Sequence, residues 1–325
     1  MALALGIDVG GTKILAAAVD TDDPTRLRRT LRVPTPAGDA ALGAIASVAR
    51  QLIAELDGAG PGGVVAVGVG VPGLVDADGA LVGAPHVPGL VGIPLRATLA
   101  AELGRPVVVD NDANCAAWAE VVCGAGTGAA EVLVVTLGTG IGGGLVVGRA
   151  LRHGAHGAAG EPGHMVVDPA GPPCPCGRRG CWERYASGSG LGWLGQQAAA
   201  RGAAPALLTR AGSVEAIRGE HVVAAAREAD PGATAVLDTF AGWLGLGLAN
   251  LVTLLDPGVV VVGGGLADEA DLFLDRTREV VASQVLGGAA RPATRIVAAT
   301  LGSDAGAIGA ALLAVPPEAV ATPGP

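Results

Sequence analysis

One histidine and three cysteines form the most specific chemical pattern in this sequence. His164 is followed by Cys174, Cys176 and Cys181, which lie close together in a stretch rich in proline and glycine. One imidazole nitrogen and three thiolates are the ligand set of a tetrahedral structural zinc site. Because four protein ligands leave no open position for a reactive water, the pattern predicts a structural zinc rather than a catalytic one.

Two further histidines compete for the same metal. His153 and His156 lie farther from the three thiols, so we expect them to be loop residues.

The N-terminus lacks the basic segment and long apolar run of a signal peptide. We therefore expect a cytoplasmic protein with reduced thiols, which favours metal binding over disulfides.

Two acids flank an amide directly after a short apolar strand. Asp110, Asn111 and Asp112 follow the run Val107–Val109. A carboxylate at a strand end can accept the proton of an alcohol while the amide holds a neighbouring hydroxyl group. Acids in this position also cap helices, so the pattern alone leaves both interpretations open.

A glycine turn near the N-terminus could bind phosphate. Gly10, Gly11, Thr12 and Lys13 offer backbone N–H groups, a hydroxyl and the only lysine of the chain. The pattern differs from a Walker A loop, because Thr12 separates Gly11 from Lys13, which that motif requires to be adjacent, and an apolar strand follows where a helix should begin. Asp8, at the end of the preceding strand, is a candidate Mg²⁺ ligand. The alternative is an ordinary hairpin turn.

A second glycine turn occurs about 130 residues later. Gly138, Thr139 and Gly140, together with Gly143, fit the G-x-G-x-x-G pattern of a dinucleotide-binding motif. That motif must open a helix, whereas Leu145–Val147 is typical of a strand, so we favour a second phosphate-binding hairpin. In both turns we expect glycine to allow positive φ and to let a ligand approach the backbone.

The elements around these motifs alternate between strands and helices. A duplicated hairpin within such a pattern predicts two related α/β domains. We expect helices at 40–56, with Asp39 as the cap, and at 95–103, 242–255 and 305–314, and strands at 64–71, 107–109 and 259–262.

Composition restricts the class of protein. A length of 325 residues allows two domains, and a net charge of −9 argues against nucleic acids and acidic membranes as partners. The apolar stretch Phe240–Leu255 is shorter than the roughly 20 residues of a membrane span, so we expect a buried helix and no membrane partner.

Together these motifs resemble the ROK family of sugar kinases and sugar-responsive repressors. The resemblance implies an α/β fold of the two-domain, actin-like (ribonuclease-H-like) type, with ATP and sugar in the interdomain cleft. We expect one domain at 1–112 plus 303–325 and the other at 113–302. The first glycine turn begins almost at residue 1, so we expect no DNA-binding domain. The resemblance covers Asp8–Lys13, Asp110–Asn114, Leu137–Gly144, Glu161–Gly188 and Asn250–Gly265.

The resemblance also implies roles for single residues. Asp112 is the expected catalytic base, and His164 is expected to bind both zinc and sugar. The other expected sugar-binding residues are Gly73, Asn111, Glu161 and Glu183. The ATP phosphates are expected at Gly10, Gly11, Thr12, Lys13, Gly138, Thr139 and Gly140, and the adenosine at Gly264 and Gly265.

The implied activity is ATP-dependent phosphorylation of a hexose at its 6-hydroxyl, with Mg²⁺ and structural Zn²⁺ as cofactors. The stretch Glu183–Gly188 resembles the glucokinases of the family, so glucose is the expected substrate. Pro162 and His86 depart from the family pattern, and N-acetylmannosamine or fructose remain alternatives. So do a non-catalytic sugar sensor and a structural zinc-binding domain. The resemblance implies a homodimer or homotetramer.

Overall fold

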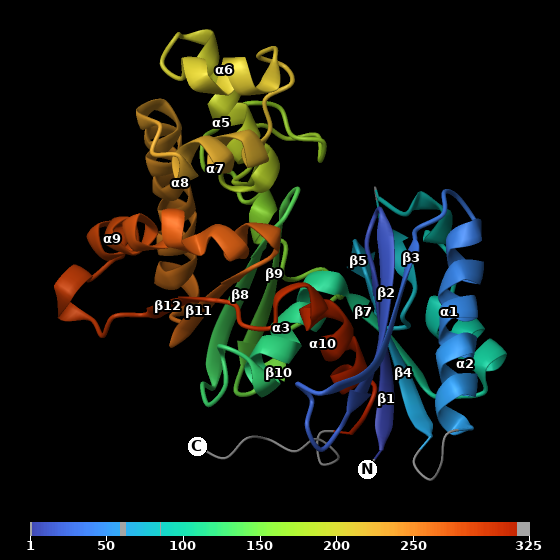
Figure 1. Cartoon of the computed structure of the whole chain (residues 1–325). Helices are drawn as coiled ribbons and strands as arrows, with labels where there is room; N and C mark the ends of the chain where they lie inside the picture. The colour runs from blue at the N-terminus through green and yellow to red at the C-terminus, as the bar shows by residue number, and fades with distance from the viewer. Residues whose placement is uncertain (1, 59–62, 85, 317–325) are drawn as a thin grey trace. The chain divides into compact units, whose positions relative to one another are not determined.

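Two five-stranded sheets organise the chain. The computed structural model describes residues 2–58, 63–84 and 86–316 (Figure 1). In sheet order, the first sheet contains β3 (Leu27–Pro34), β2 (Lys13–Asp20), β1 (Leu3–Val9), β4 (Val64–Val71) and β7 (Val107–Asn111). The second contains β10 (Ala150–Leu151), β9 (Ile141–Val147), β8 (Glu131–Leu137), β11 (Val259–Gly263) and β12 (Arg295–Ala298).

The two sheets repeat one strand order. In the first sheet, β1 pairs antiparallel with β2 and parallel with β4, and β4 pairs parallel with β7. In the second, β9 and β10 are antiparallel while β11 and β12 are parallel. Each sheet thus joins a meander to parallel strands in the same spatial sequence. The predicted α/β class and the duplication of the hairpin are confirmed.

The chain divides into two compact units. Unit 1 contains Met1–Val134, Gly144–Gly160 and Thr300–Pro325, and unit 2 contains Val135–Gly143 and Glu161–Ala299. Their limits do not coincide with the predicted domains, because unit 1 also includes the segment that follows residue 112. The boundaries at 1–112 plus 303–325 and at 113–302 stay a prediction.

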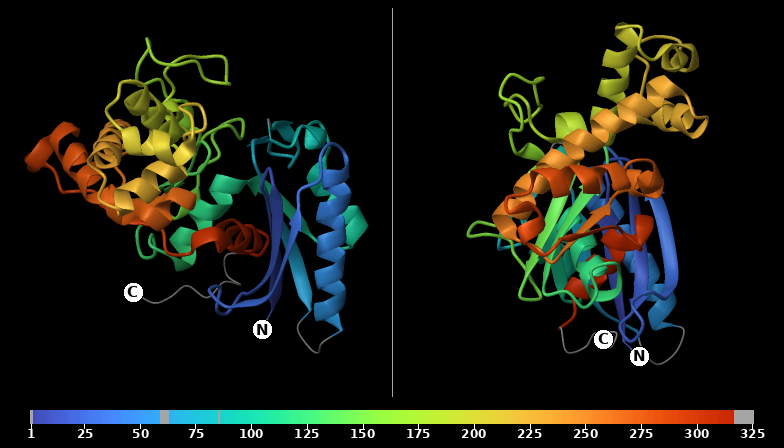
Figure 2. Two further views of the ribbon diagram at one scale, coloured as in Figure 1. Left: turned by 45° about the horizontal axis from the view of Figure 1, so that its top comes forward. Right: turned by 90° about the vertical axis from the view of Figure 1, so that its left-hand side faces the viewer.

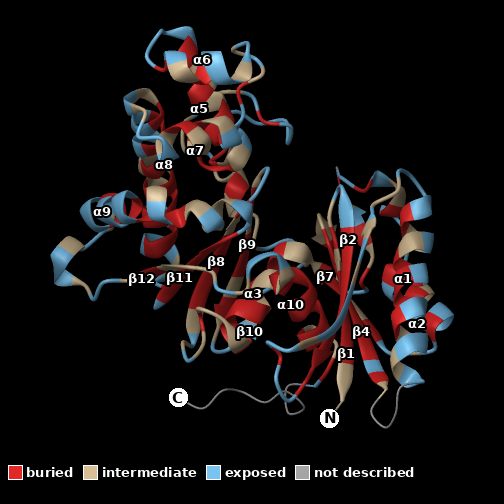
Figure 3. Cartoon of the chain, in the orientation of Figure 1, coloured by how far each residue is buried: buried red, intermediate tan, exposed pale blue. Residues whose placement is uncertain are grey.

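Unit 1 is a sheet covered by helices on both faces (Figures 1 and 3). Since side chains alternate along a strand, Leu5 and Ile7 of β1 join the core under α1 and α2, while Ala4 joins the core under α3 and α10. A Cβ at Gly6 would lie 1.8 Å from the carbonyl oxygen of Ala307, so glycine lets α10 approach the strand. The helices are α1 (Ala40–Asp57), α2 (Leu95–Leu103), α3 (Asp112–Cys123) and α10 (Ala305–Leu313); shorter elements are β5 (Leu74–Val75), β6 (Leu81–Gly83), η1 (Pro88–Leu90) and η5 (Gly302–Asp304).

Unit 2 is rich in helices. The long helix α8 (Pro231–Leu255) packs against α5 (Gly188–Ala200), α7 (Gly219–Arg227) and α9 (Leu274–Gln284) (Figure 2). The remaining elements are η2 (Pro162–His164), α4 (Glu183–Ala186), α6 (Pro205–Ala211), η3 (Gly265–Leu272) and η4 (Gly288–Ala290).

Helix α8 is longer than predicted. It begins at Pro231, where the Asp230 side chain accepts a hydrogen bond from the backbone N–H of Ala233, and not at Gly242. Its 25 residues are long and apolar enough to cross a membrane by length and composition. Because 61% of its most apolar window is buried within the protein, the prediction of a buried helix holds, although the predicted length was wrong.

The other predicted limits agree to within two residues. Helix α2 and strand β4 occupy the predicted residues, α1 extends one residue further, to Asp57, β11 extends one residue further, to Gly263, and α10 ends one residue earlier, at Leu313. Strand β7 extends two residues beyond the predicted end, so Asp110 and Asn111 belong to the strand that they were expected to follow. Asp39 precedes α1 as predicted, but its side chain makes no capping hydrogen bond.

Candidate active site

The junction of β7 and α3 brings the predicted base and amide together in unit 1. Asn111 is the N-cap of α3, and its Oδ1 accepts a hydrogen bond of 3.0 Å from the backbone N–H of Asn114. Asp112 occupies the first turn, where the positive end of the helix dipole favours a charged carboxylate. The residue is half-buried, and its Oδ1 accepts the backbone N–H of Ala113 at 2.9 Å. The start of α3 therefore suits the carboxylate of a proton acceptor.

Gly73 and Asn111 meet as the predicted sugar-binding pair. The Nδ2 of Asn111 donates a hydrogen bond of 3.0 Å to the carbonyl oxygen of Gly73. Gly73 has φ of +134°, and a Cβ there would lie 2.1 Å from the carbonyl oxygen of Gly83. Only glycine fits this position without strain, so the turn after β4 is shaped to approach Asn111.

The first glycine turn is stabilised by hydrogen bonds from the residue that follows β3. Gly10 donates its N–H to the carbonyl oxygen of Lys13 at 2.8 Å. Thr35, which follows β3, donates its hydroxyl to the Gly10 carbonyl and its N–H to the Thr12 carbonyl. Gly11, Thr12 and Lys13 are exposed. The turn is thus braced while its predicted phosphate-binding groups remain accessible, and Thr35 is a bracing residue that the sequence analysis missed.

Asp8 packs against the start of helix α10. A Cβ at Gly306 would lie 2.7 Å from the Asp8 Cγ, so a larger residue there would displace the carboxyl group. Burial raises the pKa of Asp8 to about 6, an effect that the charge of Lys13 opposes. A carboxylate that is costly to charge gains most from a nearby cation, which suits the predicted Mg²⁺ site.

The predicted zinc ligands come together in unit 2. The ligand atoms of His164, Cys174, Cys176 and Cys181 all lie within 4.8 Å of one another. The sulfurs of Cys176 and Cys181 are 3.6 Å apart, and Cys174 Sγ is 3.8 Å from His164 Nδ1. Tetrahedral zinc with Zn–S bonds of about 2.3 Å would separate two sulfurs by about 3.8 Å, so the cluster fits zinc.

Two glutamates adjoin this cluster. Glu183, at the start of α4, places Oε1 3.5 Å from His164 Nδ1. Glu161 precedes η2, where its carbonyl oxygen accepts the N–H of His164 at 3.2 Å. Burial raises the pKa of Glu161 above its usual value, and the charge of Glu183 adds to this while His164 opposes it. The three predicted sugar-binding residues of unit 2 therefore form one group with the metal cluster.

The second glycine turn lies beside this group. A Cβ at Gly140 would be 2.7 Å from Oε2 of Glu183. Gly138 accepts the N–H of Gly188 at 2.8 Å, and Thr139 accepts the hydroxyl of Ser189 at 2.7 Å through their carbonyl oxygens. The start of α5 thus supports the turn, and Ser189 is a second support that the sequence analysis missed.

The positive φ predicted for glycine in the two turns was wrong, while the close approach of a ligand to these glycines stays a prediction. None of Gly10, Gly11, Gly138 and Gly140 has φ in the positive region. At Gly140 the nearest neighbour of an added Cβ would be the carboxylate of Glu183. Gly264 does have φ of +81°, and a Cβ there would lie 2.6 Å from the backbone of Leu137 at the end of β8. Gly264 therefore borders the second turn, and a Cβ at Gly265 would meet nothing within 4 Å.

His153 and Tyr185 make hydrogen bonds beside the predicted site residues, and the sequence analysis did not predict either bond. His153 Nε2 lies 2.7 Å from Asp110 Oδ2 in unit 1. In unit 2, the hydroxyl of Tyr185 donates to Asp168 at 2.7 Å and ties α4 to the loop that carries the cysteines. His153 and Asp110 are 43 residues apart, so their proximity could not be predicted from spacing.

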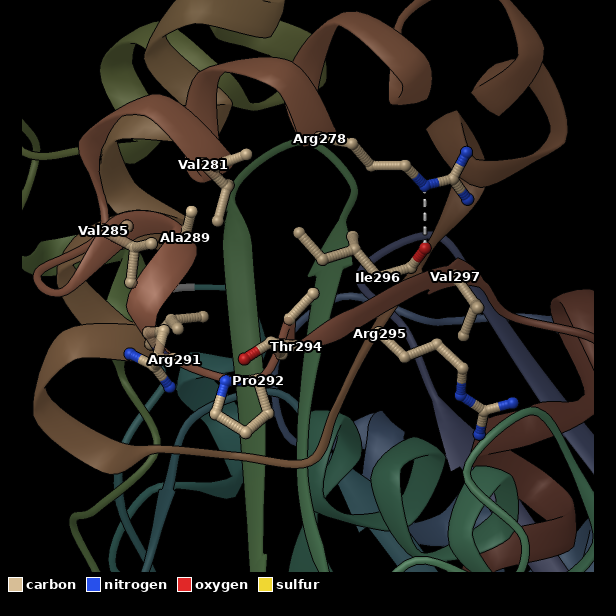
Figure 4. Close-up of a pocket in the computed structure, with 14 residues that line it drawn as sticks. Arg278, Val281, Val285, Ala289, Arg291, Pro292, Thr294, Arg295, Ile296 and Val297 are labelled. Atoms are coloured by element: carbon tan, nitrogen blue, oxygen red, sulfur yellow. Dashed lines mark hydrogen bonds between the residues drawn. The ribbon is translucent and has the colours of Figure 1, made fainter.

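A cavity of about 740 Å³ lies elsewhere in unit 2, between α9, η4 and β12 (Figure 4). Its lining is mainly apolar and contains none of the predicted site residues. Arg278 donates from Nε to the carbonyl oxygen of Ile296 at 2.9 Å, and Arg291 pairs with Asp256. These arginines are engaged with the protein, so we assign no chemistry to the cavity.

The duplicated sheets and glycine hairpins define an α/β protein of the actin-like, two-domain class. A model of the ROK family matches residues 4–316, and the chain belongs to this family. It is 42% identical to a glucokinase of Streptomyces coelicolor, over 98% of this chain and 100% of the relative. An N-acetyl-D-glucosamine kinase of Yersinia pseudotuberculosis is 35% identical, over 95% of this chain and 97% of the relative.

A solved structure supports the same assignment. The ROK family glucokinase of Streptomyces griseus, in complex with glucose and AMPPNP, matches with a TM-score of 0.83 and 42% identity, covering 96% of this chain and 99% of that one. The predicted family and fold class are confirmed.

Proposed function

We propose that this protein transfers the γ-phosphoryl group of ATP to the 6-hydroxyl of a hexose, with glucose as the preferred acceptor. The observation that carries the proposal is the arrangement at the start of α3, where Asn111 is fixed against Gly73 and Asp112 stands in the first turn. Full-length similarity to glucokinases at 42% identity supports glucose as the substrate.

The reaction needs one proton acceptor and several positioning groups. Asp112 would accept the proton of the 6-hydroxyl as its oxygen attacks the γ-phosphorus, and the bond to the leaving ADP oxygen then breaks. Asn111, Glu161, His164 and Glu183 would hold other hydroxyl groups. Because phosphoryl transfer requires little covalent participation by the protein, positioning and charge stabilisation supply most of the rate.

The glycine turns would bind the ATP phosphates. Thr12 and Lys13 are exposed in the first turn, and Thr139 is exposed in the second. The adenosine would lie along Gly264 and Gly265, where Gly264 packs against Leu137 and a Cβ at Gly265 would meet nothing within 4 Å. Asp8 would hold Mg²⁺, directly or through water, and the ion would supply charge neutralisation for the phosphates.

Zinc would have a structural role that extends to the sugar. All four positions of a tetrahedral ion would be filled by His164, Cys174, Cys176 and Cys181, so no reactive water would bind. Since Nδ1 of His164 faces the cysteines, its Nε2 remains available for a sugar hydroxyl. The metal would thereby fix the direction of a sugar-binding group.

We further propose that the protein is cytoplasmic. None of the five cysteines forms a disulfide, which fits the reducing conditions of the cytoplasm. We propose a homodimer or homotetramer, which light scattering coupled to size-exclusion chromatography would measure.

A coupled assay of ADP release with Mg-ATP tests the activity. Zinc-loaded protein would be tested with glucose, mannose, fructose, N-acetylglucosamine and N-acetylmannosamine. We expect the highest kcat/KM with glucose. Preference for an N-acetylated sugar would refute the substrate but keep the reaction, and binding of sugar without turnover would favour a sensor.

A further inference from the structure

His153 joins the loop after β10 to the junction of β7 and α3. Its Nε2 lies 2.7 Å from Oδ2 of Asp110, whose side chain is only 10% exposed. The two residues are 43 positions apart in the chain, and both belong to unit 1. Asp110 is not one of the residues proposed to touch sugar or ATP.

The other oxygen of Asp110 holds the segment that carries the proposed base. Oδ1 accepts the backbone N–H of Asn111 at 2.7 Å and the side-chain amide of Asn114 at 2.9 Å. Asn111 in turn accepts the backbone N–H of Asn114. A rotation of the Asp110 carboxylate would break these bonds together, so its orientation determines where Asn111 and the following Asp112 point.

We propose that His153 is a positioning residue for the sugar-phosphorylating site, which acts by donating its Nε2–H to Asp110 and so fixing Asn111 and Asp112. The inference rests on the proposed function for its effect on turnover.

The loop that carries His153 is anchored before and after the histidine, and before it the backbone N–H of Arg152 donates to the carbonyl oxygen of Leu145 at 2.8 Å. The carbonyl oxygen of His153 accepts the N–H of Ala159 at 3.0 Å. Gly157 packs so closely on β5 that a Cβ there would lie 2.4 Å from the carbonyl oxygen of Val75. A side chain presented from a braced loop loses little entropy on forming its hydrogen bond, which favours a positioning role.

Charge strengthens the pair. The hydrogen bond to Asp110 raises the pKa of His153, and the negative charge of the same carboxylate adds to this, while burial opposes it. The neutral imidazole retains one N–H, so the Nε2–H tautomer can keep the bond as pH rises. The contact therefore persists through the neutral range and weakens when the histidine loses its charge.

A matched pair of amides tests the proposal. In His153→Gln the side-chain nitrogen stands near the place of Nε2, whereas in His153→Asn it stands near the place of Nδ1. Since a misplacement of about 1 Å can cost about 100-fold, we expect kcat/KM for glucose to fall about 10- to 100-fold in His153→Asn and to stay within about threefold in His153→Gln. The KM for ATP should not change in either variant.

His156→Asn is the control, because His156 lies exposed three residues further along the same loop. Equal loss in the glutamine and asparagine variants, or wild-type kcat/KM in both, would overturn the proposal. The proposal would also be refuted if His153→Asn lowered thermal stability without lowering kcat/KM for glucose while leaving the KM for ATP unchanged.

A second measurement does not depend on turnover. The side-chain amide resonances of Asn114, which donates to Asp110, should move in His153→Asn and stay in place in His153→Gln and His156→Asn. Unchanged Asn114 resonances in His153→Asn would refute the positional claim. If the wild-type protein phosphorylates no sugar, the proposed function fails, while these resonances still decide whether His153 orients Asp110.

Discussion

Replacement of Gly73 by alanine tests whether the turn after β4 shapes the sugar site. The new Cβ would lie 2.1 Å from the carbonyl oxygen of Gly83 and 3.0 Å from Ala84, so the backbone must move by about 1 Å to restore ordinary contact. The φ of +134° adds strain of about 1–3 kcal/mol for a residue with a side chain. Because the Gly73 carbonyl accepts the Asn111 amide, this movement is transmitted to a proposed sugar ligand.

The expected result has two parts. The midpoint of thermal unfolding should fall by several degrees, and kcat/KM for glucose should fall about 10- to 100-fold, since misplacement of about 1 Å costs rate steeply. The KM for ATP should be unchanged. Gly83→Ala is the control in the same hairpin, because a Cβ there meets nothing within 4 Å. Wild-type stability and glucose KM in Gly73→Ala would refute the reasoning.

Three other predictions concern metal, buried charge and acid stability. Cys181→Ser, or removal of metal by a chelator, should lower the bound zinc measured by mass spectrometry and raise the KM for glucose; full activity without metal would contradict this. Glu120→Ala should destabilise the protein by roughly 3 kcal/mol in urea unfolding, because the buried carboxylate accepts several bonds, including the N–H of Thr300; a loss below about 1 kcal/mol would argue against it. Burial alone would raise the pKa of Asp20, but hydrogen bonds from Arg28 and Asp22 lower it. The stability that Asp20 contributes should therefore be present above pH 4 and be lost as the pH falls through the folded pKa. Asp20→Asn should flatten the dependence of unfolding free energy on pH in this range, and an unchanged dependence would contradict the prediction.

Local patterns predicted the elements that carry the chemistry. The runs around both glycine turns are strongly apolar and end abruptly, so the hairpins β1–β2 and β8–β9 could be placed from the sequence. The metal cluster could be predicted because three cysteines lie within one short loop, and chain connectivity alone keeps them near one another.

Long-range contacts explain what the sequence did not reveal. Gly140 lies against Glu183, and His153 pairs with Asp110; each pair is separated by 43 residues. Such proximity depends on tertiary packing, which the residue types of neighbouring positions do not reveal. The turns were therefore located correctly, while the positive φ predicted for their glycines was wrong.

The start of α8 shows a different cause of error. The segment of α8 before Gly242 contains one acid, two threonines and several small residues, which weakens the apolar pattern. The signal that determines the true start is a cap: Asp230 precedes Pro231 and accepts the N–H of Ala233. Capping chemistry can thus extend a helix beyond the stretch that periodicity alone indicates.

The turnover of Asp112→Asn with Mg-ATP and glucose tests the central claim most directly. The asparagine keeps the shape of the side chain but cannot accept the proton of the 6-hydroxyl. We predict a fall in kcat of about 100-fold or more, because a positioned general base contributes about 10²- to 10⁴-fold, with glucose affinity by calorimetry within about threefold of the wild type. A wild-type kcat in this variant would contradict the assignment of Asp112 and the mechanism built on it.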